Sequence, residues 1–142
     1  MTAHYVETSA LLNIALEGNV KLSAALSAAP SLITSSLTFV EFERALIRRR
    51  SDGTLTAAEE TRARRWAREF ASLCYVMELD GDVMERAKLP FKVEPVRTLD
   101  ALHLASIELL AKKLGWLIVV ACDDRVCQNA LALGFNVLPP PR

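Results

Sequence analysis

Residues 117–123 read LIVVACD, an apolar run that ends abruptly at the acid Asp123. A continuous apolar run of this length is typical of a strand in a parallel sheet that helices cover on both faces. The segment before it, residues 98–114, has apolar side chains on most sides of a helical pattern, which predicts a buried helix. The segment after it, residues 124–133, predicts a helix that Gly134 ends.

The same alternation of short apolar strands and helices runs along the rest of the chain. Further strands are predicted at residues 4–6, 32–34, 75–79 and 135–138, and further helices at 9–17, 36–50, 56–73 and 82–88. This order indicates an α/β fold, a three-layer α/β/α sandwich with a central, mostly parallel, Rossmann-like sheet. We expect a single domain over residues 1–142, with a helical hairpin at about 36–73, because this length suits one core.

Composition excludes some classes of protein and leaves others open. Lys and Arg number 17 and so do Asp and Glu, so the formal net charge is +0, which argues against a protein that grips nucleic acid through its overall field. A local basic patch remains possible, because phosphate contacts are local. The three cysteines match no zinc spacing, and we expect reduced, mostly buried thiols in a cytoplasmic protein. We expect no signal peptide and no membrane span, since no apolar run approaches roughly 20 residues.

Four acids lie at the edges of segments that are otherwise apolar. Glu7 and Asp123 each follow a predicted strand, Asp100 lies in the first turn of a helix, and Glu41 lies inside one. A carboxylate near a core is costly unless it is hydrogen-bonded, paired or bound to a metal. Ligands of open α/β sheets bind beyond the carboxyl ends of the strands. If the first and fourth strands are neighbours, Glu7 and Asp123 lie side by side there, and we expect the four acids to share one site.

Clustered carboxylates indicate a particular chemistry. They repel one another unless a cation joins them, and Mg²⁺ and Mn²⁺ favour oxygen ligands. Such a site suits hydrolysis of a phosphodiester. Each acid alone has an ordinary explanation, such as a helix N-terminus, a solvated rim, a turn, or a pair with arginine. We expect the two histidines, His4 and His103, to be packed or partly exposed rather than ligands.

Arginines concentrate in the predicted hairpin, around Trp66. We expect them to form a basic surface that contacts RNA phosphates, an ordinary solvated face being the alternative. The candidates for RNA binding are Arg44, Arg48, Arg65 and Arg68.

Several segments resemble PIN domains, and especially the VapC-type toxins of bacterial toxin–antitoxin pairs. They are residues 5–12, 34–46, 97–105, 120–125 and 132–137, and the resemblance that they carry extends over nearly the whole chain. Residues 97–105, which read RTLDALHLA, are the most specific match. Two positions depart from the family pattern, because Glu7 stands where the family has Asp and Ala121 stands where it usually has Thr or Ser.

The resemblance implies a PIN-type α/β/α sandwich and an endoribonuclease that depends on Mg²⁺ or Mn²⁺. It also implies a cytoplasmic homodimer, neutralised by a VapB-like antitoxin whose tail blocks the acidic pocket, and a structured tRNA or rRNA as substrate. Carried onto this chain, the expected metal ligands are Glu7, Asp100 and Asp123. Glu41 is expected to bind through a water or to position the attacking one. Ser9 is expected to support the ligands. Asp124 is the neighbour of Asp123, and it would be the ligand instead if the family pattern matches this segment one residue later.

The two departures leave a second hypothesis open. Glu7 carries one methylene more than Asp, and a shift of about 1 Å in a positioned group can cost roughly 100-fold in rate. The alternative is therefore a PIN-fold binding module that holds its antitoxin or RNA with weak or lost cleavage. A nucleotide-binding α/β protein is disfavoured because no glycine fingerprint follows the first strand. A phosphoacceptor domain is disfavoured because that strand ends without an Asp pair.

Overall fold

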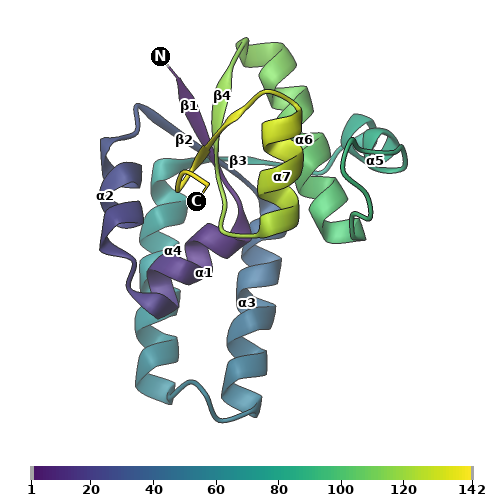
Figure 1. Ribbon diagram of the computed structural model, residues 1–142. Helices are drawn as coiled ribbons and strands as arrows, with labels where there is room; N and C mark the ends of the chain where they lie inside the picture. Colours follow the sequence, from purple (N-terminus) through teal and green to yellow (C-terminus); the bar gives the residue numbers. More distant parts are fainter. Residues whose placement is uncertain (1, 142) are drawn as a thin grey trace.

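The computed structural model describes residues 2–141, in which five parallel strands form one sheet of order β3-β2-β1-β4-β5 (Figure 1). The strands are β1 (Ala3–Val6), β2 (Ser31–Ser35), β3 (Cys74–Met77), β4 (Leu117–Val120) and β5 (Asn136–Leu138). The helices are α1 (Thr8–Glu17), α2 (Val20–Ala28), α3 (Ser36–Ser51), α4 (Ala57–Leu73), α5 (Gly81–Ala87), α6 (Thr98–Leu114) and α7 (Asp124–Ala132). The predicted fold class, an α/β/α sandwich around a parallel sheet, is confirmed.

Two separate apolar cores hold the three layers together. Helices α1 to α4 pack on one face of the sheet, and α5 to α7 pack on the other. Because successive side chains of a strand point to opposite faces, Tyr5 enters the core under α6 while Val6 enters the core under α1. Both side chains are fully buried, so β1 is covered on both sides.

The register of the sheet brings the ends of β1 and β4 together. Val6 pairs with Val120, and the backbone N–H of Glu7 donates to the carbonyl of Val120 at 2.9 Å. The predicted adjacency of the first and fourth strands is therefore confirmed. It places the segment after β1 beside the segment after β4, at the carboxyl edge of the sheet.

The helix ends follow ordinary capping chemistry. Helix α4 starts with a capping box, in which Thr56 and Glu59 exchange hydrogen bonds of 2.9 and 3.1 Å. Gly18 ends α1 in the left-handed conformation, with a φ of 66°. The N-cap of α1 is Glu7 rather than Thr8, and the Glu7 carboxylate accepts from the Ser9 N–H.

The structure also contains a helix that the sequence pattern did not predict. Helix α2 starts at the Asn19 cap, whose side chain accepts from the Leu22 N–H at 3.0 Å, and it buries only Leu22 and Leu26. Two buried positions in so short a segment give a weak helical period. The predicted strand at 75–79 starts one residue earlier and ends at Met77, and β4 ends at Val120 rather than at residue 122.

Two further expectations concern the thiols and membranes. The three cysteines are free and half-buried rather than mostly buried, and burial raises the pKa of the Cys74 and Cys127 thiols to about 12. Within residues 2–141, no helix is both long and apolar enough to cross a membrane.

Candidate active site

Glu7 lies directly after β1 and is held in place by Ser9. The Glu7 side chain is 4% exposed, and its Oε2 accepts from both the backbone N–H and the hydroxyl of Ser9. The Ser9 Oγ in turn accepts from the backbone N–H groups of Cys122, at 2.8 Å, and Asp123, at 3.0 Å. Ser9 therefore joins the first acid to the connection between β4 and α7.

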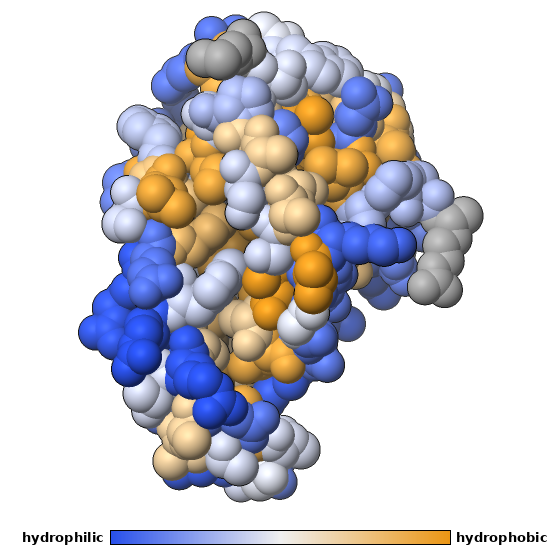
Figure 2. Space-filling model, turned by 90° about the vertical axis from the view of Figure 1, so that its left-hand side faces the viewer, coloured by the Kyte–Doolittle hydropathy of each residue, from blue (hydrophilic) through white to orange (hydrophobic). Residues whose placement is uncertain are grey.

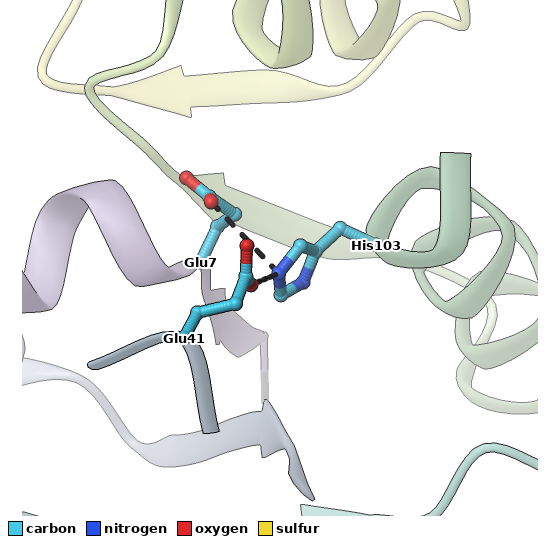
Figure 3. Close-up of side chains that lie close together, drawn as sticks. All are labelled: Glu7, Glu41 and His103. Carbon is cyan, nitrogen blue, oxygen red and sulfur yellow. Dashed lines mark hydrogen bonds and ion pairs between the residues drawn. The ribbon is translucent and has the colours of Figure 1, made fainter. Parts of the chain in front are cut away.

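Glu41 comes from the second turn of α3 and meets two donors. Its Oε1 accepts from the Thr8 hydroxyl at 2.6 Å and from Nε2 of His103 at 2.5 Å. The same Nε2 lies 3.9 Å from Oε1 of Glu7. Figure 3 shows the side chains of Glu7, Glu41 and His103 pointing toward one another from three separate elements. Each of the three offers a ligand atom, and these atoms lie within 4.8 Å of one another, close enough to hold a metal ion.

His103 is the residue that the sequence did not place in this group. It is fully buried, as expected of a packed histidine, yet both ring nitrogens make polar contacts. Nδ1 lies 2.8 Å from the Tyr5 hydroxyl, on the side of the ring away from Glu41. One signal was present in the sequence, because Asp100 and His103 are three residues apart and so share a helix face. The Nδ1 atom of His4 lies 3.3 Å from the carbonyl oxygen of Thr2, outside the group.

Asp100 and Asp123 lie next to this group rather than inside it. Burial raises the pKa of Asp100, and the negative charges of Asp123 and Glu41 raise it further, so Asp100 lies near enough to both carboxylates to be repelled by them. One oxygen of Asp123 is already used as the N-cap of α7, accepting from Arg125 at 3.0 Å and Val126 at 3.1 Å. Asp124, in the first turn of α7, is exposed.

The environments of Glu7 and Glu41 shift their pKa values in opposite directions. Burial raises the pKa of Glu7, and the neighbouring His103 and Ser9 offset this only in part. Burial also opposes ionisation of Glu41, but the hydrogen bond and charge of His103, together with Thr8, lower the pKa of that carboxyl overall. Glu41 is thus the more readily ionised of the two, and a cation beside Glu7 would remove the cost of ionising it as well.

The donor set fits a hard divalent cation. Each of the two glutamates has one oxygen engaged by its supporting hydroxyl, while Glu7 Oε1 and Glu41 Oε2 accept no hydrogen bond from the described part of the chain. Two free carboxylate oxygens with Asp100 beside them form the oxygen-rich set that Mg²⁺ and Mn²⁺ favour.

The arginines of the hairpin divide into two groups. Arg64 binds Glu43 at 2.8 Å and Glu60 at 3.1 Å, which ties α4 to α3. By contrast, five arginines of the hairpin are exposed and form no ion pair with any residue of 2–141: the four candidates for RNA binding, Arg44, Arg48, Arg65 and Arg68, and also Arg62. The charge of Arg48 helps to lower the pKa of Glu41, so this arginine lies on the side of α3 that carries the acid.

Comparison with known proteins gives consistent matches over the full length. A family model described as PIN domain matches residues 4–131. Ribonuclease VapC46 of Mycobacterium tuberculosis is 30% identical over 144 residues, which cover 99% of each chain.

Among solved structures, the sarcin–ricin loop cleaving toxin VapC20 of M. tuberculosis superposes with a TM-score of 0.65. It is 19% identical, and the match covers 93% of this chain and 95% of that one. A toxin–antitoxin complex from Klebsiella pneumoniae gives a TM-score of 0.63 at 18% identity, over 98% of both chains. VapBC2 from Rickettsia felis, bound to a DNA fragment from its promoter, gives 0.67 at 10% identity, over 96% of this chain and 97% of that one.

Proposed function

The chain belongs to the PIN domain family, as its motifs predicted, and on that basis we propose that it is a VapC-type toxin that cleaves RNA. It would act as a divalent-metal-dependent endoribonuclease that hydrolyses internal phosphodiester bonds. One observation carries the proposal: Glu7, Glu41 and His103 converge at the carboxyl edge of the sheet, with Asp100 and Asp123 next to them. The 30% identity to a ribonuclease over the whole chain supports the same reaction class.

The cation would be Mg²⁺ or Mn²⁺. Its ligands would be Glu7, through Oε1, and one carboxylate oxygen each of Asp100 and Asp123, with Asp124 as a neighbour at the rim. When bound, such an ion supplies Lewis acidity toward phosphate oxygens and water. Ser9 keeps Glu7 aimed at this position, because it engages the other oxygen of that carboxylate.

Glu41 has a separate role in this scheme. Thr8 and His103 both engage Oε1, so Oε2 is the oxygen left to accept a hydrogen bond from the attacking water. The lowered pKa of Glu41, which results from the contacts with His103 and Thr8 outweighing burial, keeps the carboxylate ionised and able to accept. The residue would orient the water and take its proton.

RNA would bind across α3 and α4. Arg44 and Arg48 follow Glu41 at helical spacing on α3, and Arg65 and Arg68 lie on α4. All four are exposed, which leaves their guanidinium groups available to RNA phosphates. VapC20 is described as a sarcin–ricin loop cleaving toxin, and this supports a structured rRNA or tRNA as the substrate here. Such RNAs would place the reaction in the cytoplasm.

An antitoxin of the VapB type would cover the α2–α4 face. Figure 2 shows hydrophobic side chains gathered on this face beside a strip of hydrophilic ones. Two pockets adjoin there at Ser23, Ser27 and Trp66, and together they make a groove whose lining includes Ile14, Val20, Leu26 and Leu73. An amphipathic helix is the partner that such a groove accepts. Two structural relatives are toxin–antitoxin assemblies, which supports the pairing.

A homodimer is the expected form of the toxin itself. Val40 is 60% exposed beside Glu41, and Leu99 is 47% exposed beside Asp100, so apolar side chains flank the acidic group. A second copy would cover them.

The alternative is a binding module that has lost cleavage. The observation in its favour is that Glu7 is also the N-cap of α1, so its longer side chain is partly committed to structure. Purified protein incubated with total bacterial RNA and Mg²⁺ or Mn²⁺ separates the two. The nuclease predicts cleavage that EDTA abolishes and that Asp100→Asn lacks, whereas the binding module predicts RNA or antitoxin binding without cleavage.

A further inference from the structure

Tyr5 and His103 have no assigned part in the reaction, although they lie directly behind Glu41. We propose that they form a positioning pair: Tyr5 holds the His103 ring through Nδ1, and the Nε2–H of His103 is donated to Glu41, so that His103 is not a metal ligand. This inference rests on the proposed nuclease function and concerns how its site is built.

The contacts run in one line from the interior of the sheet to the site. Tyr5 and His103 are both fully buried, and the Tyr5 hydroxyl lies 2.8 Å from Nδ1. The two rings meet edge-on, with an interplanar angle of 74°. On the opposite edge of the imidazole, Nε2 lies 2.5 Å from Oε1 of Glu41. A nitrogen and a carboxylate oxygen at this separation share a proton, which the nitrogen donates.

This geometry leaves neither ring nitrogen available to a cation. A metal on Nε2 would need the lone pair of that nitrogen, which would then face the Glu41 oxygen without a proton between them. Nδ1 points into the core toward Tyr5 and away from the acids. The ring therefore serves the site as a donor, although its position alone would also suit a ligand.

The consequence is a fixed direction for the free oxygen of Glu41. Oε1 receives hydrogen bonds from Thr8 and His103, and two donors from different elements define the plane of the carboxylate. Strand β1 thereby positions Glu7, which directly follows it, and orients Glu41 through Tyr5 and His103. Helix α6 supplies Asp100 and, one turn later, His103.

Imidazole nitrogen NMR tests the protonation pattern without any reaction. The chain has two histidines, and in a His4→Gln protein His103 is the only one left. In metal-free protein we expect Nε2 to carry a proton, and we expect that proton to remain when Mg²⁺ is added. The proposal would be overturned if Nε2 carries no proton in the metal-free protein, or if it loses its proton when Mg²⁺ is added, because His103 would then be a ligand.

A series of variants tests the consequence for catalysis. His103→Gln retains a side-chain N–H near the Nε2 position, and His103→Leu does not. We expect His103→Leu to lower kcat about 100-fold, the loss expected for a group misplaced by about 1 Å, and His103→Gln to recover most of it. Tyr5→Phe removes one hydrogen bond and should lower kcat up to about tenfold. Tyr75→Phe, at an exposed position on β3, is the matched control.

The division between kcat and KM distinguishes positioning from general damage. A residue that touches no substrate should change kcat while leaving KM nearly unchanged. Equal losses in His103→Gln and His103→Leu would contradict the proposal. If His103→Leu does not fold, the NMR result on the His4→Gln protein still decides the question. If the unaltered protein cleaves no RNA, the nuclease proposal fails, while the NMR result still reports on the hydrogen bond.

Discussion

Replacing Ser9 with alanine should weaken the protein substantially, because one hydroxyl makes three contacts. In Ser9→Ala, Glu7 loses a hydrogen bond, and the backbone N–H groups of Cys122 and Asp123 lose their acceptor. A lost hydrogen bond costs about 1 kcal/mol, and each partly buried amide left without a partner costs about as much. The expected loss in the free energy of unfolding is therefore about 3 kcal/mol.

Urea unfolding followed by circular dichroism measures this loss. With an m-value of about 2 kcal/mol/M, the midpoint should fall by roughly 1.5 M. Ser27→Ala is the matched control, because the Ser27 hydroxyl is exposed and bonds only to the carbonyl of Ser23, at 3.1 Å. A midpoint for Ser9→Ala equal to that of Ser27→Ala would show that Ser9 does not join the two strand ends. Metal-dependent cleavage should also fall in Ser9→Ala, since Glu7 loses its orientation.

Four further outcomes are expected. Glu7→Asp should keep or raise the rate of metal-dependent RNA cleavage, and a large loss would show that the site requires the longer side chain. Burial raises the pKa of Glu7 above its ordinary 4.5, so between these two pKa values the folded state holds a proton that the unfolded state has released. Metal-free protein should therefore lose stability as pH rises from about 4.5 toward the folded-state pKa. In EDTA, the urea midpoint of Glu7→Gln should fall less steeply with pH than that of the unaltered protein. Mg²⁺ at 100 times its Kd should add about 2.7 kcal/mol to the unfolding free energy of the unaltered protein. At the same Mg²⁺ concentration, Asp100→Asn should gain less stability, measured as a smaller rise in melting temperature. Equal rises in the two proteins would show that Asp100 is not a ligand. Arg48→Gln should reduce the slope of log RNA affinity against log salt concentration by roughly one. Arg49→Gln should leave the slope unchanged, because Arg49 is paired with Glu17 at 3.2 Å. Equal slopes for the two variants would argue against a phosphate contact by Arg48.

The sheet could be predicted because the sequence of β4 and the two residues after it are apolar without interruption. Residues 117–122 contain no polar position, and only a strand buried on both faces tolerates that. Topology then placed Glu7 beside the end of β4, and the pairing of Val6 with Val120 confirms it. Helix α2 was missed because it contributes only two buried side chains, too few to establish a helical period.

The site was harder to predict, because its contacts depend on tertiary packing. The sequence identifies the acids, but it does not show that one oxygen of Asp123 caps α7 or that Glu41 accepts a hydrogen bond from Thr8. His103 was expected to be packed or partly exposed rather than a ligand. Its helical spacing from Asp100 was the available clue, and its partner Tyr5 is 98 residues away in the chain.

Glu7 both caps α1 and belongs to the proposed site, so the first turn of α1 should respond when the site is occupied. The carboxylate that caps the helix is also the proposed metal ligand, so any displacement of it on binding would change its hydrogen bond from the Ser9 amide. Deuterium uptake at the opening turn of α1 should therefore change with occupancy, which would allow ligands and inhibitors to be screened by mass spectrometry without an RNA substrate.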